Sequence, residues 1–138
     1  MEFKSALKKA AKSLAKTGPA IISVILLMGL INAAVPKSFY GKIFIDNPLI
    51  DSFIGAVLGS IAVGNPVTSY ILGGEMLERG VSLIAVTAFI VAWVTVGVVQ
   101  FPAEVAILGK RFAIARNAVA FISAIIVALI TSLILMLL

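Results

Sequence analysis

Long apolar runs separated by short polar turns dominate the chain. The runs cover residues 18–35, 53–74, 81–99 and 118–138. A helix of about 20 apolar residues crosses the hydrocarbon of a bilayer. The first, third and last runs have 18, 19 and 21 residues, which is enough for one crossing each. The pattern therefore predicts an all-α polytopic membrane protein with three to four spans.

Polar and helix-breaking residues interrupt the second run at residues 63–69. Pro66 removes a backbone donor, and Gly64 adds freedom to bend. Asn65, Thr68 and Ser69 add polar side chains at the same point. Backbone groups freed inside a membrane need protein or a polar cavity to cover them. We interpret the interruption as the break of a discontinuous helix at a transport site, in preference to a proline kink in a plain span.

The halves of the interrupted run are too short to decide its path. Residues 53–63 and 67–74 form 11 and 8 residues of helix. The segment either crosses the membrane once as a broken helix or enters and returns as a re-entrant hairpin. After it, Glu75 and Glu78 lie in a polar turn that Gly80 ends, and we expect both carboxylates to be solvated.

The interruption has a counterpart 36 residues later. The pattern V-x-x-P-x(4)-I-L-G occurs at residues 63–73 and again at residues 99–109. Two interrupted segments in corresponding positions indicate the binding site of a transporter with an internal repeat. The candidate substrate-binding residues surround both breaks and are Gly64, Asn65, Pro66, Thr68, Ser69, Gln100, Pro102 and Glu104.

Glu104 has two interpretations, and the sequence leaves both open. It follows Pro102 by two residues, so it either lies at membrane depth or marks the end of a span at the headgroups. An ionisable residue at membrane depth is costly and is usually functional. If both breaks meet in the oligomer, we expect Glu104 to share one polar cavity with Asn65, Thr68 and Ser69 and to carry a proton during transport.

The two segments that flank the first span are less apolar. Residues 1–16 place Lys4, Lys8, Lys12 and Lys16 on one helical stripe and apolar residues on another. Such a helix lies in the membrane interface with its lysines toward the headgroups. We therefore divide the chain into an amphipathic interfacial helix, residues 1–16, and a single transmembrane domain, residues 17–138.

The loop at residues 36–52 follows the first span. Its turn residues and its apolar side chains together predict a segment that lies along the interface. We expect Asp46 and Asp51 in this loop to be solvated cap residues.

Composition excludes several classes of protein. The chain has 138 residues, of which 62% are hydrophobic and 12% are charged, and its mean hydropathy is +1.19. It contains neither cysteine nor histidine, which excludes disulfides, thiolate metal sites and Cys or His nucleophiles. We expect no enzyme activity and no cofactor. The net charge of +5 lies at the ends of apolar runs, which indicates lipid headgroups as partners and not nucleic acid.

The distribution of cations depends on the path of the interrupted segment. A single crossing leaves six Lys and Arg on one side of the membrane and five on the other. A re-entrant hairpin gives eight against three, as the positive-inside rule expects. The even split suits a half-size protein that pairs antiparallel with itself, so both interpretations remain.

Several short motifs carry a family resemblance. Gly59-Ser60, Gly64-Asn65-Pro66 and residues 78–83, followed by a long apolar run, resemble the predicted-permease family. That family includes the YraQ-type and arsenic-efflux-type membrane permeases. The resemblance covers residues 18–138 and implies one half of a permease whose family members have two related halves. Family sequences often carry cysteines near the equivalent break, and this chain has none, so the resemblance does not extend to thiol-binding metal or arsenical substrates.

Together these features predict a half-size secondary transporter in the cell membrane. We expect a homodimer that moves a small solute or ion, with Gly55, Gly59 and Gly73 as close-packing faces of the oligomer. No ATP-binding motif is present, so a gradient or a partner would supply the energy. The competing interpretation is a non-transporting scaffold or accessory subunit of a larger membrane complex.

Overall fold

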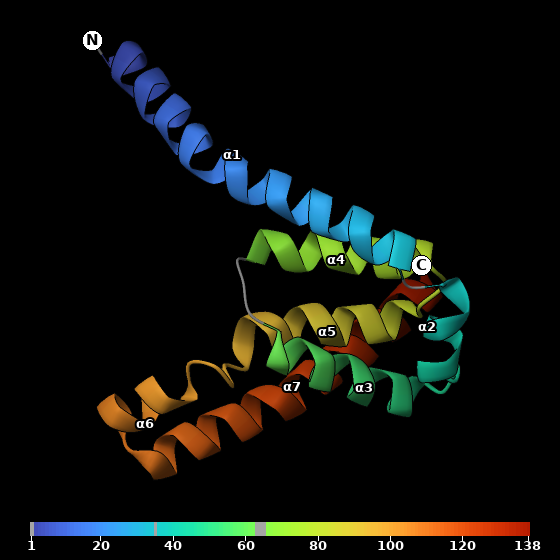
Figure 1. Cartoon of the computed structure of the whole chain (residues 1–138). Helices are drawn as coiled ribbons and strands as arrows, with labels where there is room; N and C mark the ends of the chain where they lie inside the picture. Colours follow the sequence, from blue (N-terminus) through green and yellow to red (C-terminus); the bar gives the residue numbers. More distant parts are fainter. Residues whose placement is uncertain (1, 35, 63–65) are drawn as a thin grey trace. The chain divides into compact units, whose positions relative to one another are not determined.

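A computed structural model describes residues 2–34, 36–62 and 66–138. The described residues are helical or lie in turns and caps between helices, which confirms the predicted all-α class. The helices are α1 (Glu2–Ala34), α2 (Lys37–Ile43), α3 (Pro48–Ile61), α4 (Pro66–Glu78), α5 (Leu83–Thr95), α6 (Phe101–Leu108) and α7 (Lys110–Leu137) (Figure 1).

The chain divides into two compact units, residues 1–36 and residues 37–138. The first unit consists chiefly of α1, a helix of 33 residues that joins the basic amphipathic segment to the first apolar run. The helix continues through Pro19, and the Ser23 hydroxyl donates to the Pro19 carbonyl at 2.8 Å. At 1.5 Å per residue α1 is about 50 Å long.

In the second unit, α3 and α5 run parallel and pack closely. Gly55 lies against the backbone of Ala85, and Gly59 against the backbone of Phe89, so residue numbers increase together along both helices. A Cβ atom at either glycine would lie 2.1 or 2.2 Å from a carbonyl oxygen of α5. Absence of a side chain at these two positions therefore allows the contact. The predicted close packing is present, but it lies within one chain.

The helix α4 runs back along α5. It ends at Glu78, and Gly80 in the following turn has a φ of +85°, which favours glycine. The Gly80 and Val81 N–H groups donate to Leu77 and Met76 carbonyls at 2.9 and 3.0 Å, which closes the helix end and turns the chain into α5. Gly73 faces Ile90 and Val86 of α5. Since α3 is parallel to α5 and α4 is antiparallel to it, the chain reverses direction between α3 and α4.

The helix α7 returns along both α5 and α6. Small residues make its contact with α5, where Ala124 and Ala128 pack against Ala88 and Ala92. The α5–α7 contacts fix an antiparallel pair, and α6 also packs on α7. α6 thus continues in the direction of α5 after a break, whereas α4 reverses that of α3.

One prediction about helix length is wrong. We expected residues 81–99 to form one span, but α5 has 13 residues and ends at Thr95. Val96 is extended, and the Gly97 N–H donates to the side chain of Asn117 on α7 at 2.9 Å. In a longer α5 the Gly97 N–H would bond the carbonyl four residues earlier, but here it bonds Asn117 instead. Because Asn117 is distant in the sequence, the local sequence does not predict this end of the helix.

By length and composition, α7 is a candidate membrane span. Its 28 residues cover about 42 Å at 1.5 Å per residue, and its most apolar stretch is mostly exposed. Among the helices of the described residues it alone meets both criteria. A long apolar helix with its surface exposed suits contact with lipid, which agrees with the predicted association with a membrane.

Candidate functional site

Two breaks interrupt the helices of the second unit. The first begins at Ala62, the extended residue that caps α3, and ends where α4 starts at Pro66. The second covers residues 96–100, between α5 and α6. Pro66 opens α4 and Pro102 lies in the first turn of α6, where a missing N–H costs nothing. Helix ends therefore lie at both predicted positions, with a proline in the first turn of each following helix, while residues 63–65 of the first lie outside the described residues.

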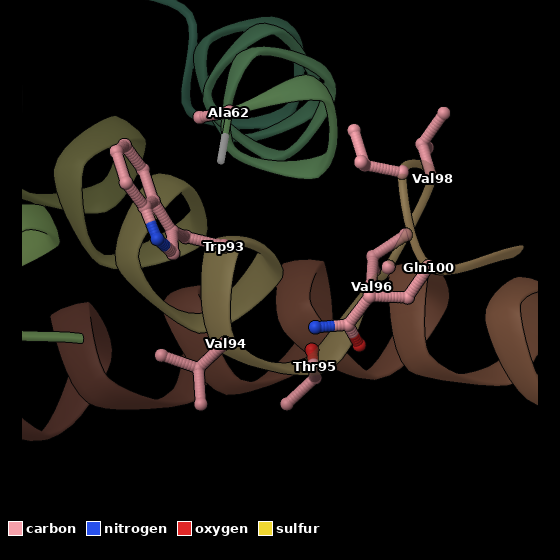
Figure 2. Close-up of a pocket in the computed structure, with 9 residues that line it drawn as sticks. Ala62, Trp93, Val94, Thr95, Val96, Val98 and Gln100 are labelled. Carbon is pink, nitrogen blue, oxygen red and sulfur yellow. The ribbon is translucent and has the colours of Figure 1, made fainter. Parts of the chain in front are cut away.

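A cavity of about 300 Å³ lies where α3 and α5 end. Because these helices run parallel, their carboxyl-terminal ends are neighbours, and each end leads into a break. Ala62 and residues 93–100 line the cavity. Figure 2 shows the side chains of Trp93 and Gln100 on opposite sides of it. The cavity thus adjoins both breaks within one chain.

The lining is about half polar and half apolar, and it carries no charge. Its polar side chains are Trp93, Thr95 and Gln100, and non-helical backbone from residue 96 onward contributes further N–H and C=O groups. The Thr95 hydroxyl donates to the Val91 carbonyl at 2.7 Å, so its oxygen still has acceptor capacity. Such a lining can form hydrogen bonds with a small molecule.

The predicted residues of the first break do not gather at this cavity. Gly64 and Asn65 lie outside the described residues. Pro66 is exposed and Thr68 is half-buried, and neither lines the cavity. Ser69 is buried, and its hydroxyl donates to the Pro66 carbonyl at 2.7 Å. The Ser69 hydroxyl thus has a local partner within the first turn of α4.

The predicted residues of the second break separate into three positions. Gln100 lines the cavity, whereas Pro102 is exposed on α6. Glu104 contacts α7: its two carboxylate oxygens accept hydrogen bonds from Arg116 and Asn117. The Glu104 side chain is 14% exposed, so its carboxylate is paired with α7 and largely shielded from solvent. It also does not line the cavity of the single chain, and a cavity shared with Asn65, Thr68 and Ser69 in an oligomer stays a prediction.

Sequence reasoning missed the partners of Glu104. In the sequence, Arg116 is one of three cations, with Lys110 and Arg111, that precede the last apolar run, and nothing distinguishes Asn117. Their positions are nevertheless symmetric, because Glu104 and Arg116 each lie six residues from Lys110. Gly109, with a φ of +86°, turns the chain there, and a helical hairpin brings such residues together. An interpretation of Gly109 as a hairpin turn would have found the pair.

Asp51 was predicted to be solvated, and that prediction is wrong. It is 1% exposed and lies in the first turn of α3, beside the start of α5. Its carboxylate accepts from the Ile45 N–H at 3.0 Å and from the Ser82 hydroxyl at 3.4 Å. The positive ends of two parallel helices meet there, which favours a buried anion. Asp51 therefore holds together the end of the α3–α5 pair opposite the cavity.

Comparison with protein-family models, with curated proteins and with solved structures finds no match.

Proposed function

We propose that this protein is a multi-pass membrane permease that moves a small solute or ion through the cavity between the two breaks. The observation that carries the proposal is the cavity itself. Two interrupted segments end at one polar space, and interrupted helices in membrane proteins commonly surround a binding site. The resemblance to the predicted-permease family supports the same interpretation.

Helix lengths support three crossings of the membrane. α3 and α4 have 14 and 13 residues, about 20 Å each, and run in opposite directions, so they suit a re-entrant hairpin. α1, the α5–α6 segment and α7 would make the crossings. Eight of the 11 Lys and Arg residues then lie on the side of the amino terminus, including Lys110, Arg111 and Arg116. The positive-inside rule places that side in the cytoplasm.

The chemistry of the lining limits the solute. None of the lining residues is ionisable at neutral pH. A multiply charged ion would therefore have no counter-charge in the lining, and an unpaired buried charge is very costly. Hydroxyl, amide and indole groups suit a neutral or singly charged solute. A volume of about 300 Å³ admits only a small one.

A second copy of the chain would complete the cover of the cavity. Val98, Val99 and Gln100 form an exposed turn in the described structure. Backbone at membrane depth requires cover by protein or by a water-filled space. The support for a homodimer lies in this exposed break, because Gly55, Gly59 and Gly73 pack within the chain.

Flux in liposomes tests the proposal. Purified protein would be reconstituted, and the flux of Na⁺, K⁺, chloride and glycerol would be measured with empty liposomes as control. The chain has no cysteine, so Val98→Cys supplies a unique thiol at the lining. We expect a methanethiosulfonate reagent to block flux in this variant. Ile107→Cys, an exposed position on α6 outside the lining, is the matched control and should keep its flux.

Two outcomes would reject the proposal. Flux that persists when the Val98→Cys thiol is fully modified would place the path elsewhere. Absence of flux for every solute, together with a stable hetero-complex isolated from native membranes, would favour the scaffold function.

A further inference from the structure

The second break leaves two backbone groups without the partners that a continuous helix would give them. The Gly97 N–H lies two residues beyond the end of α5 and donates to Oδ1 of Asn117 at 2.9 Å. The Thr95 carbonyl accepts from Nη2 of Arg116 at 3.4 Å. Two adjacent side chains of α7 therefore supply the partners. Both Thr95 and Gly97 belong to the wall of the cavity.

Glu104 fixes the orientation of these side chains. One carboxylate oxygen pairs with Nη1 of Arg116, and the other accepts from Nδ2 of Asn117 at 2.8 Å. Nδ2 also donates to the Ala113 carbonyl at 2.9 Å. The amide nitrogen of Asn117 is thus directed to α6 and α7, and its oxygen is left for Gly97. We call Glu104, Arg116 and Asn117 the Glu104 network.

The helix α6 has little else to hold it in place. It has eight residues, none of them buried, and it packs on α7. Glu104 connects α6 to α7 through its ion pair with Arg116 and its hydrogen bond from the Asn117 side-chain amide. Charge-assisted hydrogen bonds of this kind are stronger than neutral ones. Loss of the network would release α6 and the backbone of residues 96–100 together.

We infer that the Glu104 network is a positioning device that holds residues 95–97 in the shape that lines the cavity, with Asn117 as the positioning residue. Asn117 does so because, among the described residues, it is the side chain that bonds both the Gly97 backbone and the Glu104 carboxylate. That the cavity holds a solute rests on the proposed function, whereas the effect of the network on the shape of residues 95–97 does not. Glu104 acts through Asn117 and Arg116 and does not contact solute.

The donor and acceptor of the bond between residues 104 and 117 can be exchanged. The bond from residue 117 to the Ala113 carbonyl is lost in both variants described here, because an aspartate has no donor, so it cancels in their comparison. In Asn117→Asp a second carboxylate faces Glu104, and the two repel. In the double variant Asn117→Asp with Glu104→Gln, the glutamine amide donates to the aspartate, and its oxygen still accepts from Arg116. The other aspartate oxygen still accepts from Gly97. If Asn117 acted only by filling space, Glu104→Gln would not correct the effect of Asn117→Asp.

Thiol labelling of the full chain in detergent measures the position of the wall without any solute. Val96→Cys places a thiol in the wall, where Val96 is 6% exposed. Val86→Cys reports general unfolding, because Val86 is 3% exposed and packs in the other core cluster of α5. A maleimide reagent is added, and its reaction rate is compared in the parent, Asn117→Asp and double-variant backgrounds.

We expect Asn117→Asp to raise the labelling rate at Val96→Cys by about tenfold, the effect of losing one buried hydrogen bond. The rate at Val86→Cys should not change. The double variant should return the rate at Val96→Cys to within about twofold of the parent, since the bonds of residue 117 to Gly97 and to residue 104 are restored. An unchanged rate at Val96→Cys, an equal rise at both thiols, or no return in the double variant would each overturn the inference. Because the labelling assay uses no solute, its result tests the Glu104 network even if the flux experiment finds no transport.

Discussion

The close approach of α3 to α5 predicts that Gly59→Ala strongly destabilises the fold. A Cβ atom at Gly59 would lie 2.2 Å from the Phe89 carbonyl oxygen and 3.0 Å from its carbon. Both are backbone atoms, so no side-chain rotation relieves the overlap. The helices would have to separate by roughly 1.3 Å to restore an ordinary contact of about 3.5 Å.

The loss of packing sets the magnitude. A radial gap of about 1 Å forfeits roughly half of the dispersion energy of a contact. The α3–α5 interface is the most extensive contact between helices in the described structure, so the loss extends over many atoms. Overpacking of a core costs about 1–3 kcal/mol, and we expect about 3 kcal/mol here. That value lowers the folding equilibrium constant roughly a hundredfold.

Gly74→Ala is the matched control. Gly74 is also helical, but a Cβ atom there would have no atom within 4 Å. Alanine is favoured over glycine inside a helix by about 1 kcal/mol, so this variant should be neutral or slightly more stable. A difference between the two substitutions therefore reports the helix contact and not the loss of glycine.

Unfolding by sodium dodecyl sulfate in mixed micelles measures both variants. Trp93 is the one tryptophan of the chain, and its ring meets that of Phe89 edge-to-face at 5.4 Å, so its fluorescence reports on α5. We expect Gly59→Ala to lower the midpoint and Gly74→Ala to leave it unchanged or raise it. An unchanged midpoint for Gly59→Ala would refute the backbone contact between α3 and α5.

Two further variants use the same unfolding assay. Asp51→Leu leaves the Ile45 N–H and the Ser82 hydroxyl without their acceptor and should cost about 2 kcal/mol. Asp51→Asn keeps one acceptor oxygen and should cost less, and equal losses would contradict the role of the carboxylate. Gly109→Ala puts a side chain at a φ of +86° and should cost about 1–2 kcal/mol. Gly41→Ala, at an open helical position, should cost nothing, and an equal effect at both glycines would contradict the strain.

The sequence was sufficient to locate the breaks because their causes are local. Pro66 and Pro102 each lack a backbone donor and are therefore best placed in a first helical turn. The structure starts α4 at Pro66 and α6 at Phe101, one residue before Pro102. Gly80 is similarly local: it ends α4 because it alone in the turn adopts a positive φ without strain.

The sequence did not reveal what lies opposite each residue, because that depends on the tertiary fold. The glycines at positions 55 and 59 indicated a close neighbour, but their spacing is the same whether the neighbour is another chain or α5. Asp51 closely follows the turn residues Asn47 and Pro48, and only the parallel arrangement of α3 and α5 buries it. The early end of α5 likewise depends on Asn117, which is 20 residues away from Gly97.

The two copies of the repeated sequence pattern have different structural consequences. Gly73 lies inside α4 and packs against α5, so α4 continues for another five residues. The corresponding Gly109 has a φ of +86° and ends α6, so that the chain turns into α7. The repeat therefore encodes the start of a helix after a break, while the residues beyond it decide the topology.

Because α4 reverses the chain and α6 does not, the two breaks approach the cavity from non-equivalent directions. Asn117 fixes the second break, whereas it forms no bond with the described part of the first. A substitution at one proline is thus not expected to reproduce the effect of a substitution at the other.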